Sequence, residues 1–260
     1  MDLRLKDRVY VVTGASRGLG LAAARELAAE GARLVLSGRT AATVEAAARE
    51  LSGTGEGVAR HRRVLGVVAD QADPGSPERL LSAAREAFGR VDGVLISVGG
   101  PPAGAAADVT DEQWLTAFEA VFLGAVRLAR AAAAELGEGG VIGFVLSGSV
   151  HEPIPGLAVS NGLRPGLAGF AKTLTEELGP RGIRVVGLLP SRIDTDRVRE
   201  LDGIGGDPEG ARARASEAIP LRRYGAPEEF GRVAAFLLSP AASYLTGTLL
   251  PVDGGAQRGL

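Results

Sequence analysis

Thr13-Gly14-Ala15-Ser16-Arg17-Gly18-Leu19-Gly20 connects an apolar, β-branched run at residues 9–12 to a helical pattern that starts at residue 19. A turn of this kind needs glycines where the backbone approaches a phosphate group, because a Cβ would stand in the way. The helix that follows presents free N–H groups to an anion. The stretch therefore predicts a dinucleotide-binding turn; the alternative is a tight turn of the same shape that binds no ligand.

The rest of the chain alternates short β-branched runs with longer amphipathic stretches, which is typical of a parallel sheet covered by helices on both faces. The predicted strands are residues 8–12, 33–37, 64–69, 93–97, 141–146, 184–188 and 249–252. The predicted helices are residues 19–30, 40–52, 77–88, 111–136, 163–178 and 227–238. With 260 residues and 45% hydrophobic content, the chain suits an α/β fold: a single Rossmann-type doubly wound domain over residues 1–260, with a seven-stranded parallel sheet.

The composition narrows the class of function. The formal net charge is −2 with acids and bases interspersed, so we expect no nucleic-acid partner. The first residues carry charges and no run of about 18 apolar residues occurs, so we expect neither a signal peptide nor a membrane span. The absence of cysteine excludes disulfides, thiolate metal sites and a cysteine nucleophile. These observations predict a cytoplasmic protein that acts on a small molecule and holds no metal.

Two stretches are rich in glycine. Residues 201–211 are polar and follow a predicted strand, where ligands bind in folds of this class, so we expect a lid at about residues 195–220. Residues 53–57 predict a plain surface loop.

The glycine turn resembles the TGxxxGxG motif of the short-chain dehydrogenase/reductase family, and in particular its 3-oxoacyl-carrier-protein-reductase-like branch. The resemblance extends from about residue 5 to residue 255 and includes Leu245-Thr246-Gly247 and Val252-Asp253-Gly254-Gly255 near the end of the chain. It implies that the cofactor is bound by Gly14, Ser16, Arg17, Gly18, Leu19, Gly20, Arg39, Asp70, Gly99, Arg164, Pro190, Ile193 and Thr195.

The residues after the second predicted strand bear on which dinucleotide is bound. An acid there would bond the 2′-hydroxyl of the adenosine ribose, whereas a base would pair with a 2′-phosphate. This chain has Ser37-Gly38-Arg39 and no acid, and Arg17 supplies a second base in the glycine turn. We therefore expect NADP(H) to be preferred over NAD(H), unless Arg39 is only a solvated residue at a helix start. The resemblance gives Asp70 a bond to the adenine amino group, although an aspartate there can also be a simple helix cap.

The catalytic residues of the family are altered in this chain. Its members use a tyrosine as proton donor, a lysine four residues later, an upstream serine and an asparagine. Here the tyrosine position falls on Ser160, the lysine position on Arg164 and the asparagine position on Val121. Arginine keeps the charge but, with a pKa far above neutrality, cannot relay a proton, and a serine hydroxyl is a poor acid at neutral pH. The resemblance thus implies an atypical active site.

Three further residues are candidates for catalysis. The serine of the family corresponds to Ser147 by its distance from the tyrosine position, or to Ser149 by the local Ser-Gly-Ser-Val pattern. Either could bond a carbonyl oxygen or cap a strand end. His151 lies in the loop that follows, and because imidazole titrates near neutrality it could replace the missing acid. The alternative for His151 is a solvent-facing side chain.

Two functions remain open from the sequence alone. The first is an NADP(H)-dependent oxidoreductase acting on a carbonyl or alcohol substrate, with His151, water or Ser160 as proton donor. The second is a catalytically inactive NADP(H)-binding sensor or scaffold. In either case the resemblance implies a homotetramer or homodimer that packs through the long helices at residues 111–136 and 163–178.

Overall fold

The computed structural model describes residues 1–52 and 63–259, and within them a seven-stranded parallel sheet runs in the order β3-β2-β1-β4-β5-β6-β7. The strands are β1 (Val9–Val12), β2 (Arg33–Gly38), β3 (Val64–Val68), β4 (Gly93–Ile96), β5 (Val141–Val145), β6 (Arg184–Pro190) and β7 (Thr248–Val252). The order reverses between β1 and β4, which are neighbours in the sheet although two strands separate them in the chain. Such a switch point opens a crevice at the carboxyl ends of the strands.

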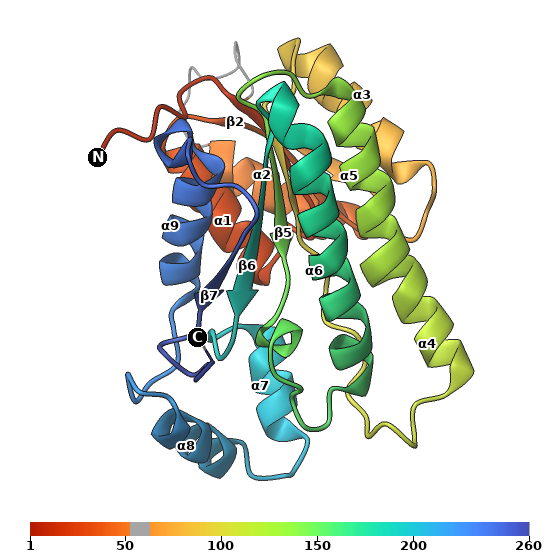
Figure 1. The fold of residues 1–260 in the computed structure, drawn as a ribbon, viewed down its shortest axis with the longest axis vertical. Helices are drawn as coiled ribbons and strands as arrows, with labels where there is room; N and C mark the ends of the chain where they lie inside the picture. The colour runs from red at the N-terminus through yellow and green to blue at the C-terminus, as the bar shows by residue number, and fades with distance from the viewer. Residues whose placement is uncertain (53–62, 260) are drawn as a thin grey trace.

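Helices cover both faces of the sheet (Figure 1). The main helices are α1 (Gly18–Ala29), α2 (Ala41–Ser52), α3 (Ser76–Phe88), α4 (Asp111–Ala117), α5 (Gly124–Glu135), α6 (Ala158–Leu178), α7 (Asp196–Gly203), α8 (Pro208–Ala218) and α9 (Pro227–Leu238). One hydrophobic core lies between the sheet and α1, α2 and α9, and a second lies between the opposite face and α3, α5 and α6. Because both faces are covered, β1, β4 and β5 are apolar and buried along their whole length.

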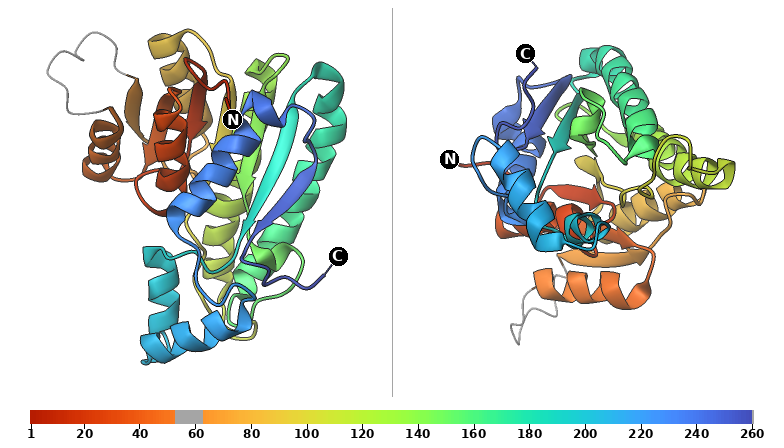
Figure 2. Two further views of the ribbon diagram at one scale, coloured as in Figure 1. Left: turned by 90° about the vertical axis from the view of Figure 1, so that its left-hand side faces the viewer. Right: turned by 90° about the horizontal axis from the view of Figure 1, so that it is seen from below.

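The helices α7 and α8 stand apart from these two layers. They project beyond the carboxyl ends of the strands, at the bottom of the molecule in Figure 1 and in the left view of Figure 2. The predicted lid at residues 195–220 therefore corresponds to two helices joined by a short turn. None of the helices among residues 1–52 and 63–259 is long and apolar enough to cross a membrane.

The sequence predicted all seven strands to within two residues of their observed bounds. The predicted helix at 111–136 is interrupted by a π-helical segment, Phe118–Leu123, and α6 begins at Ala158 instead of residue 163. Hydrophobic packing explains the early start of α6, because Val159 and Leu163 are buried in a small cluster with Ala117 and Val121. The expected loop at residues 53–57 lies outside the described residues.

Candidate functional site

A cavity of about 1270 Å³ lies at the carboxyl ends of the strands, beneath α7 and α8. All the residues expected to bind the cofactor line it, from the glycine turn to Thr195. Three of the five residues expected to act in catalysis, Ser147, Ser160 and Arg164, also line it. The structure therefore brings together most of the predicted site, from six regions of the chain that are apart in sequence.

The glycine turn has the geometry that a close phosphate contact requires. Gly14 and Gly18 have φ values of +56° and +58°, and a Cβ on Gly14 would lie 2.6 Å from the carbonyl oxygen of Ser97. A Cβ on Gly20 would lie 2.5 Å from the carbonyl oxygen of Gly14. Helix α1 starts at Gly18 without a side-chain cap, so its first N–H groups remain available to an anion. These residues fit the pyrophosphate of a dinucleotide.

The residues at the adenosine end of the cavity are exposed. Arg17 and Arg39 make no ion pair with any other described residue, which leaves both guanidinium groups available to a phosphate. Asp70 accepts a hydrogen bond from the Ala72 N–H at 3.0 Å through Oδ1, so this aspartate does cap a turn. Its second carboxylate oxygen makes no hydrogen bond within the described residues and can still accept one from a ligand.

Gln71 is a residue of the site that we did not predict. Its Nε2 atom donates to the hydroxyl of Thr13 and to the carbonyl oxygen of Ser97, the latter at 3.2 Å. The Thr13 hydroxyl in turn donates to the same carbonyl at 2.8 Å. These bonds tie together the ends of β1, β3 and β4 below the cavity. Its place directly after Asp70 was the only signal in the sequence.

The three serines form a hydrogen-bonded group. The Ser149 N–H donates to the hydroxyl of Ser147 at 3.1 Å, and the hydroxyls of Ser149 and Ser160 lie 3.1 Å apart. Ser147 and Ser160 line the cavity, whereas Ser149 is buried behind them. The structure therefore places Ser147 and Ser160 on the cavity wall, and Ser149 bonds the first through its backbone N–H and the second through its hydroxyl.

Arg164 lies on α6, one turn after Ser160, and only 5% of it is exposed. Its Nη1 atom donates to the carbonyl oxygen of Val145, at the end of β5, at 2.6 Å. Its Nε is buried and has no partner among the described residues. Burial lowers the pKa of the Arg164 guanidinium to about 10, which still leaves it charged at neutral pH.

Apolar residues line the cavity near the start of α6. Val121, at the position of the family's asparagine, lies in the π-helical segment and lines the cavity. Such segments within helices are frequent at functional sites. Trp114, the only tryptophan of the chain, belongs to the same cluster and packs against Gly162, where a Cβ would meet its ring at 2.7 Å. Val121 therefore offers no hydrogen bond where an asparagine would.

The structure does not support the expected role of His151. This residue is exposed at the end of the short 3₁₀ turn Gly148–Val150 and does not line the cavity. Its backbone N–H donates to the carbonyl oxygen of Gly148 at 3.1 Å. The imidazole therefore lies outside the cavity that Ser147 lines, and the alternative of a solvent-facing histidine agrees with the geometry.

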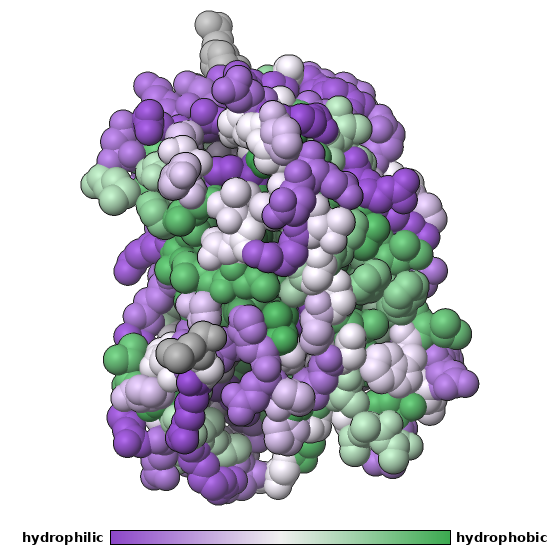
Figure 3. Space-filling view, viewed as in Figure 1, coloured by the Kyte–Doolittle hydropathy of each residue, from purple (hydrophilic) through white to green (hydrophobic). Residues whose placement is uncertain are grey.

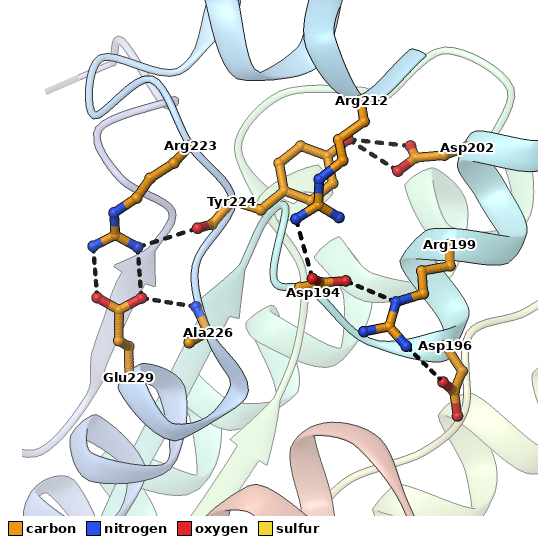
Figure 4. A network of polar contacts seen from close by, with 9 residues as sticks. All are labelled: Asp194, Asp196, Arg199, Asp202, Arg212, Arg223, Tyr224, Ala226 and Glu229. Carbon is orange, nitrogen blue, oxygen red and sulfur yellow. Dashed lines mark hydrogen bonds and ion pairs between the residues drawn. The ribbon is translucent and has the colours of Figure 1, made fainter. Parts of the chain in front are cut away.

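Arginine contacts hold the two lid helices in place (Figure 4). Asp202 of α7 is buried and accepts from the Arg192 guanidinium at 2.7 Å and from the Tyr224 hydroxyl at 3.0 Å. Arg212 of α8 stacks on the Tyr224 ring with its Cζ 4.4 Å from the centroid, and donates to Asp194 at 3.0 Å. Hydrogen bonding to Arg212 holds the pKa of Asp194 below its usual value.

In the described part of the chain, one side-chain hydrogen bond joins α7 to the loop across the cavity. Arg197 of α7 donates to the carbonyl oxygen of Pro101 at 2.6 Å and lies against Gly100. The loop that carries Pro101 is fixed to the loop before α6, because the Gly104 N–H donates to the carbonyl oxygen of Gly156 at 2.8 Å. Asn161 holds the latter loop through two hydrogen bonds to the backbone of residue 154. These contacts hold α7 next to the loop that carries Pro101, at the edge of the cavity.

This fold and glycine turn define a class of dinucleotide-binding enzymes, and comparison with known proteins names it. A family model described as enoyl-(acyl carrier protein) reductase matches residues 14–257. The chain is 37% identical over 255 residues to L-rhamnose 1-dehydrogenase (NAD(P)(+)) of Azotobacter vinelandii, covering 96% of this chain and 97% of the relative. It is 34% identical to human dehydrogenase/reductase SDR family member 4, covering 98% and 90%.

A solved structure agrees with these matches. L-Sorbose reductase from Gluconobacter frateurii, in complex with NADPH and L-sorbose, superposes with a TM-score of 0.89 at 32% identity, over 100% of both chains. The chain therefore belongs to the short-chain dehydrogenase/reductase family.

Proposed function

We propose that this protein is an NADP(H)-dependent oxidoreductase that transfers a hydride between nicotinamide and a carbonyl or alcohol substrate. The observation that carries the proposal is the single cavity in which the glycine turn meets Ser147, Ser160 and Arg164. The related proteins support it, since one is an NAD(P)(+)-dependent sugar dehydrogenase and another is bound to NADPH and a ketose.

The preference for NADP(H) over NAD(H) rests on Arg39 and Arg17. Both are exposed at the adenosine end of the cavity and lack acidic partners within the described residues, so a 2′-phosphate would meet two free guanidinium groups. NAD(H) would leave these two charges without a ligand. A lower affinity for NADH follows.

The chain's own residues limit how the proton can move. When bound, the nicotinamide supplies or accepts the hydride. The Ser147 and Ser160 hydroxyls line the cavity and can hold a substrate oxygen or a water molecule, with Ser149 orienting Ser160. Arg164 stays charged and stabilises a developing negative charge without giving up a proton. We therefore assign the proton donor to water held by these hydroxyls.

The second candidate function is a catalytically inactive sensor or scaffold that binds NADP(H). One observation favours it: no phenol or amine lines the cavity among the described residues, so the ordinary donor of the family has no direct replacement. This candidate differs from the first only in turnover, because the cofactor turn is the same in both.

We also propose that the protein assembles as a homodimer or homotetramer. Leu115 and Phe118 are 67% and 40% exposed on the continuous helix formed by α4, the π-helical segment and α5. Figure 3 shows apolar surface over the edge strand β7 and along this helix, as a buried contact between copies would require. A cytoplasmic location remains a prediction from the sequence.

A calorimetric titration with NADPH and, in parallel, NADH tests the cofactor assignment. We expect NADPH to bind at least about 10-fold more tightly, since charge-assisted bonds of this kind contribute about 1.5–3 kcal/mol. Arg39→Ala should remove most of that difference, whereas exposed Arg90→Ala, outside the cavity, should leave it unchanged.

Transfer of deuterium from C4-deuterated NADPH to a panel of ketones and ketoses then separates the two functions. Labelled alcohol product supports the oxidoreductase. Tight NADPH binding without any label transfer supports the sensor, and no binding of either dinucleotide refutes both.

A further inference from the structure

Arg164 has more hydrogen-bond donors than the protein uses. A guanidinium carries five N–H donors, and the one acceptor of Arg164 among the described residues is the carbonyl oxygen of Val145. Its Nε makes no hydrogen bond within the described part of the chain, although only 5% of the residue is exposed and it lines the cavity. A buried donor without a partner destabilises the protein unless a ligand satisfies it.

Arg184 shows how the same chain treats a buried arginine that has only a structural role. It is 7% exposed and, like Arg164, has no acidic partner within the described residues. Its guanidinium donates to three carbonyl oxygens, those of Leu237, Ser239 and Leu245, at 2.8 to 3.2 Å. It lies outside the cavity. The open donors of Arg164 are therefore a feature of the site.

Among the residues that the structure describes, no acid in the cavity compensates the charge of Arg164. Five of the described acids line the cavity, and four of them already pair with arginines around α7 and α8: Asp196 with Arg199, Glu200 with Arg197, Asp202 with Arg192, and Asp207 with Arg214. The fifth, Asp70, lies after β3 and bonds the Ala72 N–H. An unpaired buried cation is costly, and an anionic ligand would remove that cost.

The remaining lining near the start of α6 is apolar. Val98, Val121, Ile154, Pro155 and Leu157 line the cavity, together with the serine hydroxyls. A ligand that fits these walls has a short apolar body and one anionic group. A polyhydroxylated sugar would instead need several polar partners, and Val121 provides none.

We infer that Arg164 holds the carboxylate of the substrate, which is an oxo- or hydroxy-carboxylate with a short apolar body. The inference rests on the proposed function and names its substrate class. In the reductive direction the carbonyl carbon gains a hydride from the reduced nicotinamide, and the carbonyl oxygen gains a proton from water. The carboxylate keeps its charge throughout, so Arg164 binds and orients the substrate in both directions.

The test compares two ligands of similar shape. The protein, saturated with NADP⁺ so that no reduction occurs, is titrated by calorimetry with 2-oxobutyrate and with 2,3-pentanedione, in which a methyl group replaces a carboxylate oxygen. We expect 2-oxobutyrate to bind about 10- to 100-fold more tightly. Arg164→Gln should abolish this preference, and Arg164→Lys should retain part of it because the charge remains. Arg181→Gln is the control, since Arg181 also donates to one backbone carbonyl but lies outside the cavity.

Two results would overturn the inference: equal affinities for both ligands, or a preference that survives Arg164→Gln. Loss of NADPH affinity in Arg164→Gln with an unchanged ligand ratio would make Arg164 a ribose ligand only, and would also overturn it. If the wild-type protein binds no dinucleotide, the proposed function fails, and the same two titrations of the cofactor-free protein decide the inference. If Arg164→Gln does not fold by circular dichroism, the wild-type ratio and Arg164→Lys decide it.

Discussion

The contacts of Asp202 predict how firmly the lid is held. Asp202→Ala removes the ion pair with Arg192 at 2.7 Å and leaves the hydroxyl of buried Tyr224 without an acceptor. A charge-assisted bond to a partly exposed arginine contributes about 1 kcal/mol, and a buried hydroxyl left unpaired costs about 1–3 kcal/mol. The lid should therefore open more easily by about 2–4 kcal/mol, which corresponds to a roughly 30- to 1000-fold larger open population.

Hydrogen exchange of the α7 and α8 amides, followed by mass spectrometry, measures this opening directly. Asp202→Asn keeps an acceptor for Tyr224 and should show a smaller effect. Asp196→Ala is the matched control, because Asp196 lies on the same helix but its side chain is 60% exposed and its ion pair with Arg199 is longer, at 3.4 Å. If exchange in Asp202→Ala equals that of the wild type and of Asp196→Ala, then Asp202 does not hold the lid and the reasoning is refuted.

Three further predictions concern single residues. His151→Ala should leave turnover within about twofold of the wild type, because the imidazole is outside the cavity; a loss of 10-fold or more in kcat would restore the substitute-acid interpretation. Hydrogen bonding to Arg223 holds the pKa of Glu229 at about 2, below its usual 4.5. Glu229→Gln should therefore be less stable than the wild type above pH 4.5, and this difference in stability should vanish as the pH falls through 2. Urea unfolding at pH 6, 4 and 2 measures the difference, and a difference that does not change with pH would contradict the prediction. Phe118→Glu should lower the mass found by light scattering to that of a smaller assembly, whereas an unchanged mass would exclude this helix from the interface.

The sequence was sufficient to predict the strands of the sheet, because each strand is a short apolar run bounded by glycines and polar residues. The same local pattern was not sufficient to predict α8, because none of its residues is buried and it is held by the contact of Arg212 with the distant Tyr224. The predicted helix at residues 163–178 also missed the first turn of α6, where burial of Val159 in a tertiary cluster favours a helix.

The spacing of residues was sufficient to predict that the glycine turn, Ser160 and Arg164 lie around one cavity. The choice between Ser147 and Ser149 could not be made from spacing and local pattern together, because it depends on which side of a 3₁₀ turn faces the cavity. The same turn decided the exposure of His151. Gln71 and Arg197 act through bonds to backbone carbonyls of other strands and loops, and such bonds leave no pattern in the sequence.

The packing of Trp114 against Gly162 gives the protein a built-in optical probe. As the only tryptophan, it reports from one place, in the apolar cluster that includes Val121 of the cavity wall. Tryptophan emission overlaps the absorption of reduced nicotinamide, so binding of NADPH should quench the intrinsic fluorescence by energy transfer, and oxidation of the nicotinamide should restore much of it. Occupancy and redox state of the cofactor could thus be followed in real time in the unlabelled wild-type chain.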